Sequence, residues 1–171
     1  MTHEPHHFAG RLIALIESHA EELTRGTVEQ LQASSRTPSY HGLSYRDLHE
    51  RVFDVYHDFG HWLLEKTEGA VRGKYYDLGV RRSRERIPLS EVLWALVLTK
   101  NYLGSYLAAW ALSDSAVELY RQQELDRLIT HFFDRAMCYA AEGYEHPPDA
   151  ESLEEESLSA ARRRSGAGWV L

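Results

Sequence analysis

Two histidines four residues apart, His57 and His61, are the first candidates for chemistry in this sequence. On a helix this spacing places both imidazoles on one face, where they could bind a metal ion. A complete metal site would need two further ligands and groups that orient them. At about 100° per residue, both histidines lie on the side of the helix opposite Leu48 and Phe59. We therefore interpret the pair as part of a solvent-exposed polar face, and we predict no metal.

A third histidine, His19, lies on the apolar stripe of the first expected helix. An imidazole in that position could ligate a haem iron. More often such a histidine is a hydrogen-bonded residue of a core or an interface. We predict no cofactor, and we keep haem binding as the alternative.

Basic residues gather on and after the third expected helix. They are Arg72, Lys74, Arg81, Arg82, Arg84 and Arg86. In a chain with a net charge of −7 this is the strongest local charge asymmetry. The last four guanidinium groups could dock an acidic partner through bidentate contacts. They could instead pair with acidic faces of neighbouring helices or meet water.

Signatures of catalysis are lacking in the sequence. The glycine-containing segments are not followed by the Lys-Ser/Thr pair of a phosphate-binding loop. There is no Gly-x-Ser-x-Gly or His-Glu-x-x-His motif, and Cys138 has no obvious activating partner. We predict that the protein is not an enzyme.

The composition indicates one globular domain. The chain has 171 residues, of which 43% are hydrophobic and 26% charged. Its negative charge would repel a polyanion, so we expect no nucleic-acid partner. A single cysteine and a polar amino terminus fit a cytoplasmic protein. The apolar stretch 92–112 carries Lys100 at its middle, where a membrane would impose a cost of ~2.5–3.5 kcal/mol, so we expect no membrane segment.

Helical periodicity recurs along most of the chain and predicts an all-α fold. The expected helices span about 8–31, 44–69, 70–86, 90–110 and 114–144. They form a bundle of about five main helices in one domain, residues 1–147, around a buried central helix at 92–110. A globin-like set of crossed helices is the alternative, because periodicity does not determine crossing angles. Residues 148–171 are expected to form a charged tail, a short helix followed by a frayed end.

Four segments of the chain resemble a known family. They are Tyr75-x-x-Leu78-Gly79-x-x-Arg82-Ser83-Arg84, Ile87-Pro88-Leu89-Ser90-Glu91-Val92-Leu93-x-Ala95-Leu96, Phe133-Asp134-Arg135-Ala136 with the following Tyr139 and Gly143-Tyr144-Glu145, and Thr37-Pro38-Ser39-Tyr40 before the second expected helix. They resemble the amino-terminal domain of RsbRD-type RsbT co-antagonist proteins. The matched residues are of structural type: Gly79 suits a close-packing position, and Pro88 with Ser90 suits a helix boundary.

This resemblance implies an all-α input domain, similar to the non-haem globin-like domains of stressosome proteins. Those domains pair as dimers and usually precede a STAS or kinase output domain. Here a short charged tail follows Glu145 instead, which leaves open whether the protein acts alone or through a separate partner. We therefore expect a non-enzymatic sensory or protein-interaction module of a bacterial, stress-response-like signalling pathway, acting as a homodimer that binds a protein partner. The alternative is a small-molecule or haem sensor.

Overall fold

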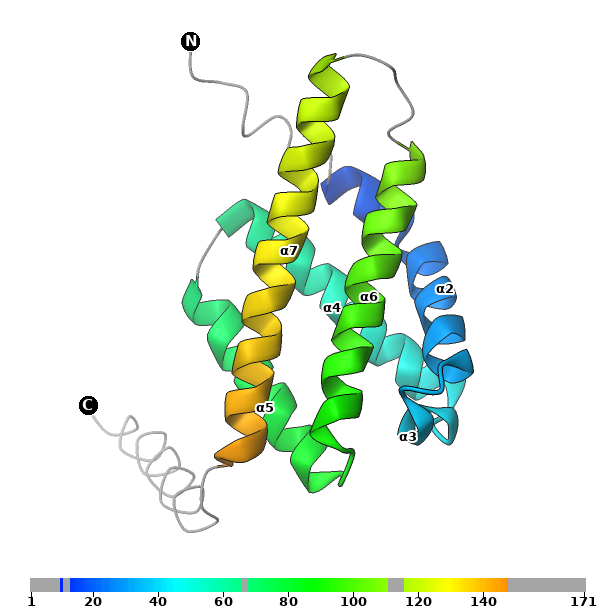
Figure 1. The fold of residues 1–171 in the computed structure, drawn as a ribbon, viewed down its shortest axis with the longest axis vertical. Helices are drawn as coiled ribbons and strands as arrows, with labels where there is room; N and C mark the ends of the chain where they lie inside the picture. Colours follow the sequence, from blue (N-terminus) through cyan, green and yellow to red (C-terminus); the bar gives the residue numbers. More distant parts are fainter. Residues whose placement is uncertain (1–9, 11–12, 66–67, 111–115, 148–171) are drawn as a thin grey trace, which may run out of the picture.

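A computed structural model describes residue 10 and residues 13–65, 68–110 and 116–147 of the protein. All regular elements in these ranges are α-helices, so the predicted all-α fold is confirmed (Figure 1). They are α2 (Ala20–Ala33), α3 (Pro38–His41), α4 (Tyr45–Glu65), α5 (Glu68–Arg84), α6 (Leu89–Trp110) and α7 (Ala116–Glu145). The predicted tail at 148–171 lies outside the described residues.

The helix predicted from residue 8 to residue 31 is interrupted at His19. Residues 13–18 are helical, but His19 lies in a turn with φ −115° and ψ 11°, and α2 begins after it. The predicted break that follows contains the one-turn helix α3, which begins at Pro38, where a missing N–H costs no helical hydrogen bond. The buried Thr37 donates a hydrogen bond of 2.8 Å to the Leu31 carbonyl and so fixes the turn.

Helices α6 and α7 form an antiparallel pair, and α4 runs diagonally behind both of them (Figure 1). Helix α2 lies alongside α6. The centre of the core is aromatic. The ring centroid of Phe132 lies 5.2 Å from that of Phe59 and 5.7 Å from that of Tyr75, both in edge-on geometry. Such edge-to-face pairs add stability beyond the area that they bury.

Two glycines allow α5 and α7 to touch backbone to backbone. A Cβ atom at Gly79 would lie 2.0 Å from the Ala140 carbonyl oxygen, and one at Gly143 would lie 2.0 Å from the Tyr76 carbonyl oxygen. No side chain fits at those distances. The sequence-based assignment of Gly79 to a close-packing position is confirmed.

Helix α6 buries one face and leaves the opposite face partly open. Val92, Leu96, Leu103 and Leu107 are buried, as the predicted stripe requires. The second apolar face is only half-buried, at Trp94, Leu98, Tyr102 and Tyr106, and Asn101, Ser105 and Ala108 are exposed. The bundle is confirmed, but its most apolar helix, which contacts α2, α5 and α7, is fully buried on one side alone.

Candidate functional site

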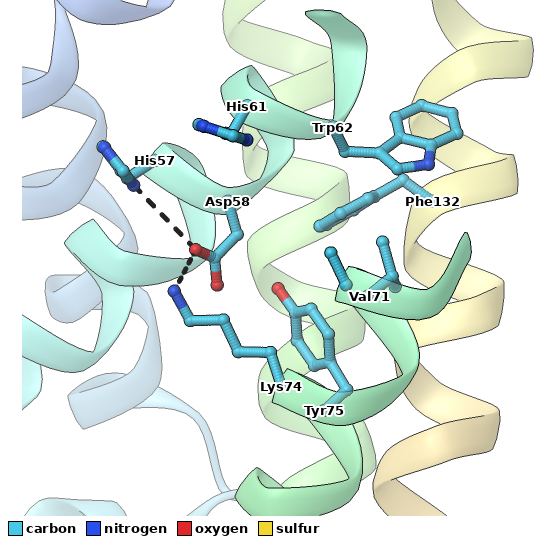
Figure 2. A pocket seen from close by; sticks show the side chains of 9 residues that line it. His57, Asp58, His61, Trp62, Val71, Lys74, Tyr75 and Phe132 are labelled. Carbon is cyan, nitrogen blue, oxygen red and sulfur yellow. Dashed lines mark hydrogen bonds and ion pairs between the residues drawn. The ribbon is translucent and has the colours of Figure 1, made fainter. Parts of the chain in front are cut away.

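A cavity of about 280 Å³ lies between α4, α5 and α7. The described residues that line it are His57, Asp58, His61 and Trp62 of α4, Ala70, Val71, Lys74 and Tyr75 of α5, and Phe132 of α7 (Figure 2). They recur at intervals of three and four residues because each helix presents successive turns to the same space. One wall is therefore aromatic and aliphatic, and the other carries ionisable groups.

An ion pair forms the charged wall of the cavity. Lys74 Nζ donates to Asp58 Oδ1, and His57 Nδ1 lies 3.9 Å from the same oxygen. Burial raises the pKa of the Asp58 carboxyl above its ordinary value, while the bond from Lys74 acts in the opposite direction. The carboxylate and the ammonium largely cancel each other's charge within the cavity.

The Tyr75 hydroxyl is a buried polar group without a hydrogen-bond partner among the described residues. Tyr75 is only 1% exposed, and Figure 2 shows its hydroxyl pointing between Asp58 and the wall formed by Val71 and Phe132. Burial raises the pKa of this phenol well above its ordinary value, so the group stays protonated. Tyr56, also 1% exposed, differs because its hydroxyl bonds Thr27 Oγ1 at 2.5 Å. An unpaired buried hydroxyl is costly and calls for an explanation.

The two candidate metal ligands, His57 and His61, stand at the rim of this cavity. Both side chains are exposed while Leu48 and Phe59 are fully buried, so their predicted position on the solvent side is confirmed. Their ring centroids are 6.3 Å apart and tilted by 34°. Across the described ranges, no group of three or more histidine, cysteine, aspartate or glutamate side chains could hold a metal ion. The structure therefore places the two histidines at the edge of the cavity and not within a set of metal ligands.

The candidate haem ligand, His19, lies elsewhere, at the break before α2. Its Nδ1 is 3.0 Å from the Tyr106 hydroxyl and 3.6 Å from Glu22 Oε2. The Tyr106 hydroxyl also donates to Glu22 at 2.6 Å. The ring therefore belongs to a polar contact between the start of α2 and the end of α6. It is not among the described residues that line the cavity.

The four arginines predicted to form one partner-binding surface do not share a surface. Arg81, Arg84 and Arg86 are exposed, but Arg82 is only 6% exposed. Its Nη1 donates to both oxygens of Glu85, at 3.1 and 3.0 Å. Burial lowers the pKa of Arg82, as does the neighbouring Arg51. The assignment of Arg82 to the surface was wrong, because α5 turns this position toward α4.

Glu85 joins Arg82 to a second arginine. Arg51 of α4 donates from Nη1 and Nη2 to the two Glu85 oxygens, at 3.0 and 3.2 Å. One carboxylate thus neutralises two guanidinium groups and connects α4 to the end of α5. This part of the basic cluster is structural.

The cavity contains the residue types of a binding site more than those of a catalytic one. Its described lining has no serine, threonine or cysteine that an adjacent base could activate. It pairs apolar walls with a few convergent polar groups, which is typical of small-molecule sites. The sequence singled out His57 and His61 as candidate ligands but assigned no role in a cavity to Asp58, Lys74 or Tyr75, because such a role depends on how α4, α5 and α7 surround one space.

Comparison with known proteins adds no assignment: no protein-family model, curated protein or solved structure matches the chain. In the part of the chain that the structure describes, no helix combines the length and the apolar content needed to cross a membrane.

Removing the Asp58 carboxylate is expected to change the pH dependence of stability. Because its pKa is higher in the folded state than the ordinary value of 3.8, the folded protein holds the proton more tightly than the unfolded chain does. Part of the stability present at low pH is therefore lost as pH rises from the ordinary pKa of the carboxyl through its pKa in the folded state. The loss is less than about 1.4 kcal/mol per pH unit.

Asp58→Asn should therefore gain stability relative to the wild type as pH rises above the ordinary carboxyl pKa of 3.8, measured by urea unfolding at a series of pH values. Asp54→Asn, at an exposed position one turn earlier on α4, is the matched control and should not show this trend. If the free energy of unfolding of the wild type rose relative to that of Asp58→Asn as pH increased, the prediction would be contradicted.

Proposed function

We propose that the protein is a non-enzymatic sensory and protein-interaction module of a bacterial signalling pathway, acting in the cytoplasm as a homodimer. The observation that carries this proposal is the uncharged outward face of α6. Outward positions of this helix hold only neutral side chains, half-buried or exposed. They are Trp94, Val97, Leu98, Asn101, Gly104, Ser105 and Ala108.

The charged residues of α6 are both engaged with other elements. Glu91 is buried and accepts hydrogen bonds from the Ser39 backbone N–H at 2.7 Å and from the Ser39 hydroxyl at 3.1 Å. Lys100 Nζ lies 3.5 Å from Asp134 Oδ1 of α7. A 22-residue helix whose two charged side chains are both paired with other elements, in a chain with 26% charged residues, favours contact with another uncharged surface.

A second copy of the chain offers such a surface. In a two-fold dimer the same patch faces itself, so an uncharged, small-residue face is matched without any further adaptation. Small side chains at Gly104, Ser105 and Ala108 would let two α6 helices approach closely. The exposed Arg81, Arg84 and Arg86 are then available to an acidic surface of a separate signalling partner.

The double substitution Ser105→Arg and Ala108→Arg should dissociate the proposed dimer. Both positions are exposed in the single chain, so the fold should be retained, but a dimer would have to bury unpaired charges. We expect the dimer dissociation constant to rise at least about 100-fold, since such burial costs ~3 kcal/mol or more. Sedimentation equilibrium measures this constant directly.

Gln123→Arg on α7 is the matched control, because it adds a charge at another exposed helical position. It should leave the dimer intact. A wild-type chain that sediments as a monomer at high concentration would rule out the proposed dimer.

A further inference from the structure

We propose that the cavity between α4, α5 and α7 binds a small, neutral, amphipathic molecule, with an aromatic body and one hydroxyl-type group that hydrogen-bonds to Tyr75. This inference deepens the sensory half of the proposed function, on which it rests. It is independent of the proposed dimer face on α6.

The size of the cavity limits the ligand. An engineered cavity of about 150 Å³ in another protein holds benzene, which has six heavy atoms. The 280 Å³ available here therefore suits a body of roughly a dozen heavy atoms or fewer. One substituted aromatic ring, or a fused bicyclic ring, has the required volume.

The lining selects the shape and the polarity of the ligand. Trp62, Phe132 and Val71 offer faces and methyl groups that suit an aromatic body (Figure 2). The Trp62 and Phe132 ring centroids are 5.6 Å apart and inclined at 50°, so the two rings pack against each other and form one continuous aromatic wall. An aliphatic chain of the same volume would gain less from these rings.

Charge complementarity favours a neutral ligand. The carboxylate of Asp58 is already paired with Lys74, so neither a free anion nor a free cation is needed to balance the site. A charged ligand would also have to leave water and disrupt that pair. The exposed His57 and His61 line the cavity at its solvent side.

The Tyr75 hydroxyl supplies the specific contact. It is buried, points into the cavity and has no hydrogen-bond partner among the residues that the structure describes, so a ligand hydroxyl or carbonyl would satisfy it. The gain is larger than for an exposed hydroxyl, because the unbound state already bears the cost of the unmade bond. The Asp58 carboxylate also lines the cavity, where it can accept a hydrogen bond from a ligand hydroxyl.

The test compares p-cresol with toluene, two probes that differ by one hydroxyl. Isothermal titration of the full chain should show saturable binding of p-cresol in the millimolar range, as expected for so few atoms. Tyr75→Phe should weaken p-cresol binding about five- to tenfold and leave toluene binding unchanged, since one hydrogen bond is lost. Without ligand, Tyr75→Phe should not lower the thermal unfolding midpoint.

Tyr56→Phe is the matched control, a buried tyrosine whose hydroxyl has the partner Thr27. It should lower the unfolding midpoint and leave p-cresol binding unchanged. Ala70→Phe fills the cavity from an exposed position on α5 and should abolish binding of both probes. This variant replaces Tyr75→Phe as the test if Tyr75→Phe does not fold. Absence of saturable p-cresol binding, or equal binding by wild type and Tyr75→Phe, overturns the proposal. Sedimentation of the same samples shows separately whether the proposed dimer stands.

Discussion

Gly79→Ala is expected to lower the free energy of unfolding by about 2–3 kcal/mol, although alanine is the better helix former. The added methyl group would lie 2.0 Å from the Ala140 carbonyl oxygen and 2.7 Å from the Tyr144 nitrogen. These are backbone atoms of α7, so no rotamer change can relieve the overlap, and the two helices must separate. Urea unfolding followed by circular dichroism measures the loss. Gly143→Ala, at the reciprocal contact with Tyr76, should cost a similar amount.

Gly73→Ala is the matched control on the same helix. No atom of the described residues lies within 4 Å of a Cβ atom built at Gly73, and the position is exposed. There the substitution only reduces backbone freedom in the unfolded chain, and we expect a gain of about 0.5–1 kcal/mol. Equal effects at Gly73 and Gly79 would contradict the close contact between α5 and α7.

Much of the fold could be predicted from the period of the apolar residues. The stripe from Leu48 to Leu63 is buried as expected, because a long amphipathic helix has a single way to remove its apolar face from water. The interruption at His19 could not be predicted, since the apolar period of the preceding turns continues into α2. Periodicity also overestimated the burial of α6. It reports that a face is apolar, whereas the number of neighbouring helices decides whether that face is covered.

The candidate site could be predicted only in part. The spacing of His57 and His61 placed them correctly on the solvent side of α4, because that follows from the geometry of one helix. The cavity depends on the distance between α4 and α5, which no local pattern encodes. Tyr75 illustrates the limit: only the packing reveals that its buried hydroxyl lacks a partner among the described residues while that of Tyr56 has one. The same holds for Arg82, whose charge suggested the surface.

Glu85→Gln is expected to cost about 2–3 kcal/mol of folding stability, which is large for a change that preserves size. The carboxylate is shared by Arg82, whose side chain is 7% exposed, and Arg51, whose side chain is 25% exposed. Removing its charge leaves two guanidinium groups facing each other in a partly buried position, and breaking a buried pair is costly because the remaining charge stays desolvated. The glutamine oxygen still accepts one hydrogen bond, which keeps the loss at the lower end of the usual range.

Two further variants separate this mechanism from a general loss of packing. In the Glu85→Gln background, Arg82→Met should recover part of the lost stability, because it removes the unpaired charge and keeps the aliphatic stem buried. Glu50→Gln is the surface control. Its partner Arg46, at 3.2 Å, has a side chain that is 87% exposed, so the loss should stay within about 0.5 kcal/mol. If the double variant were less stable than Glu85→Gln alone, Arg82 would contribute mainly through its packing, and α4 would be connected to α5 by shape more than by charge.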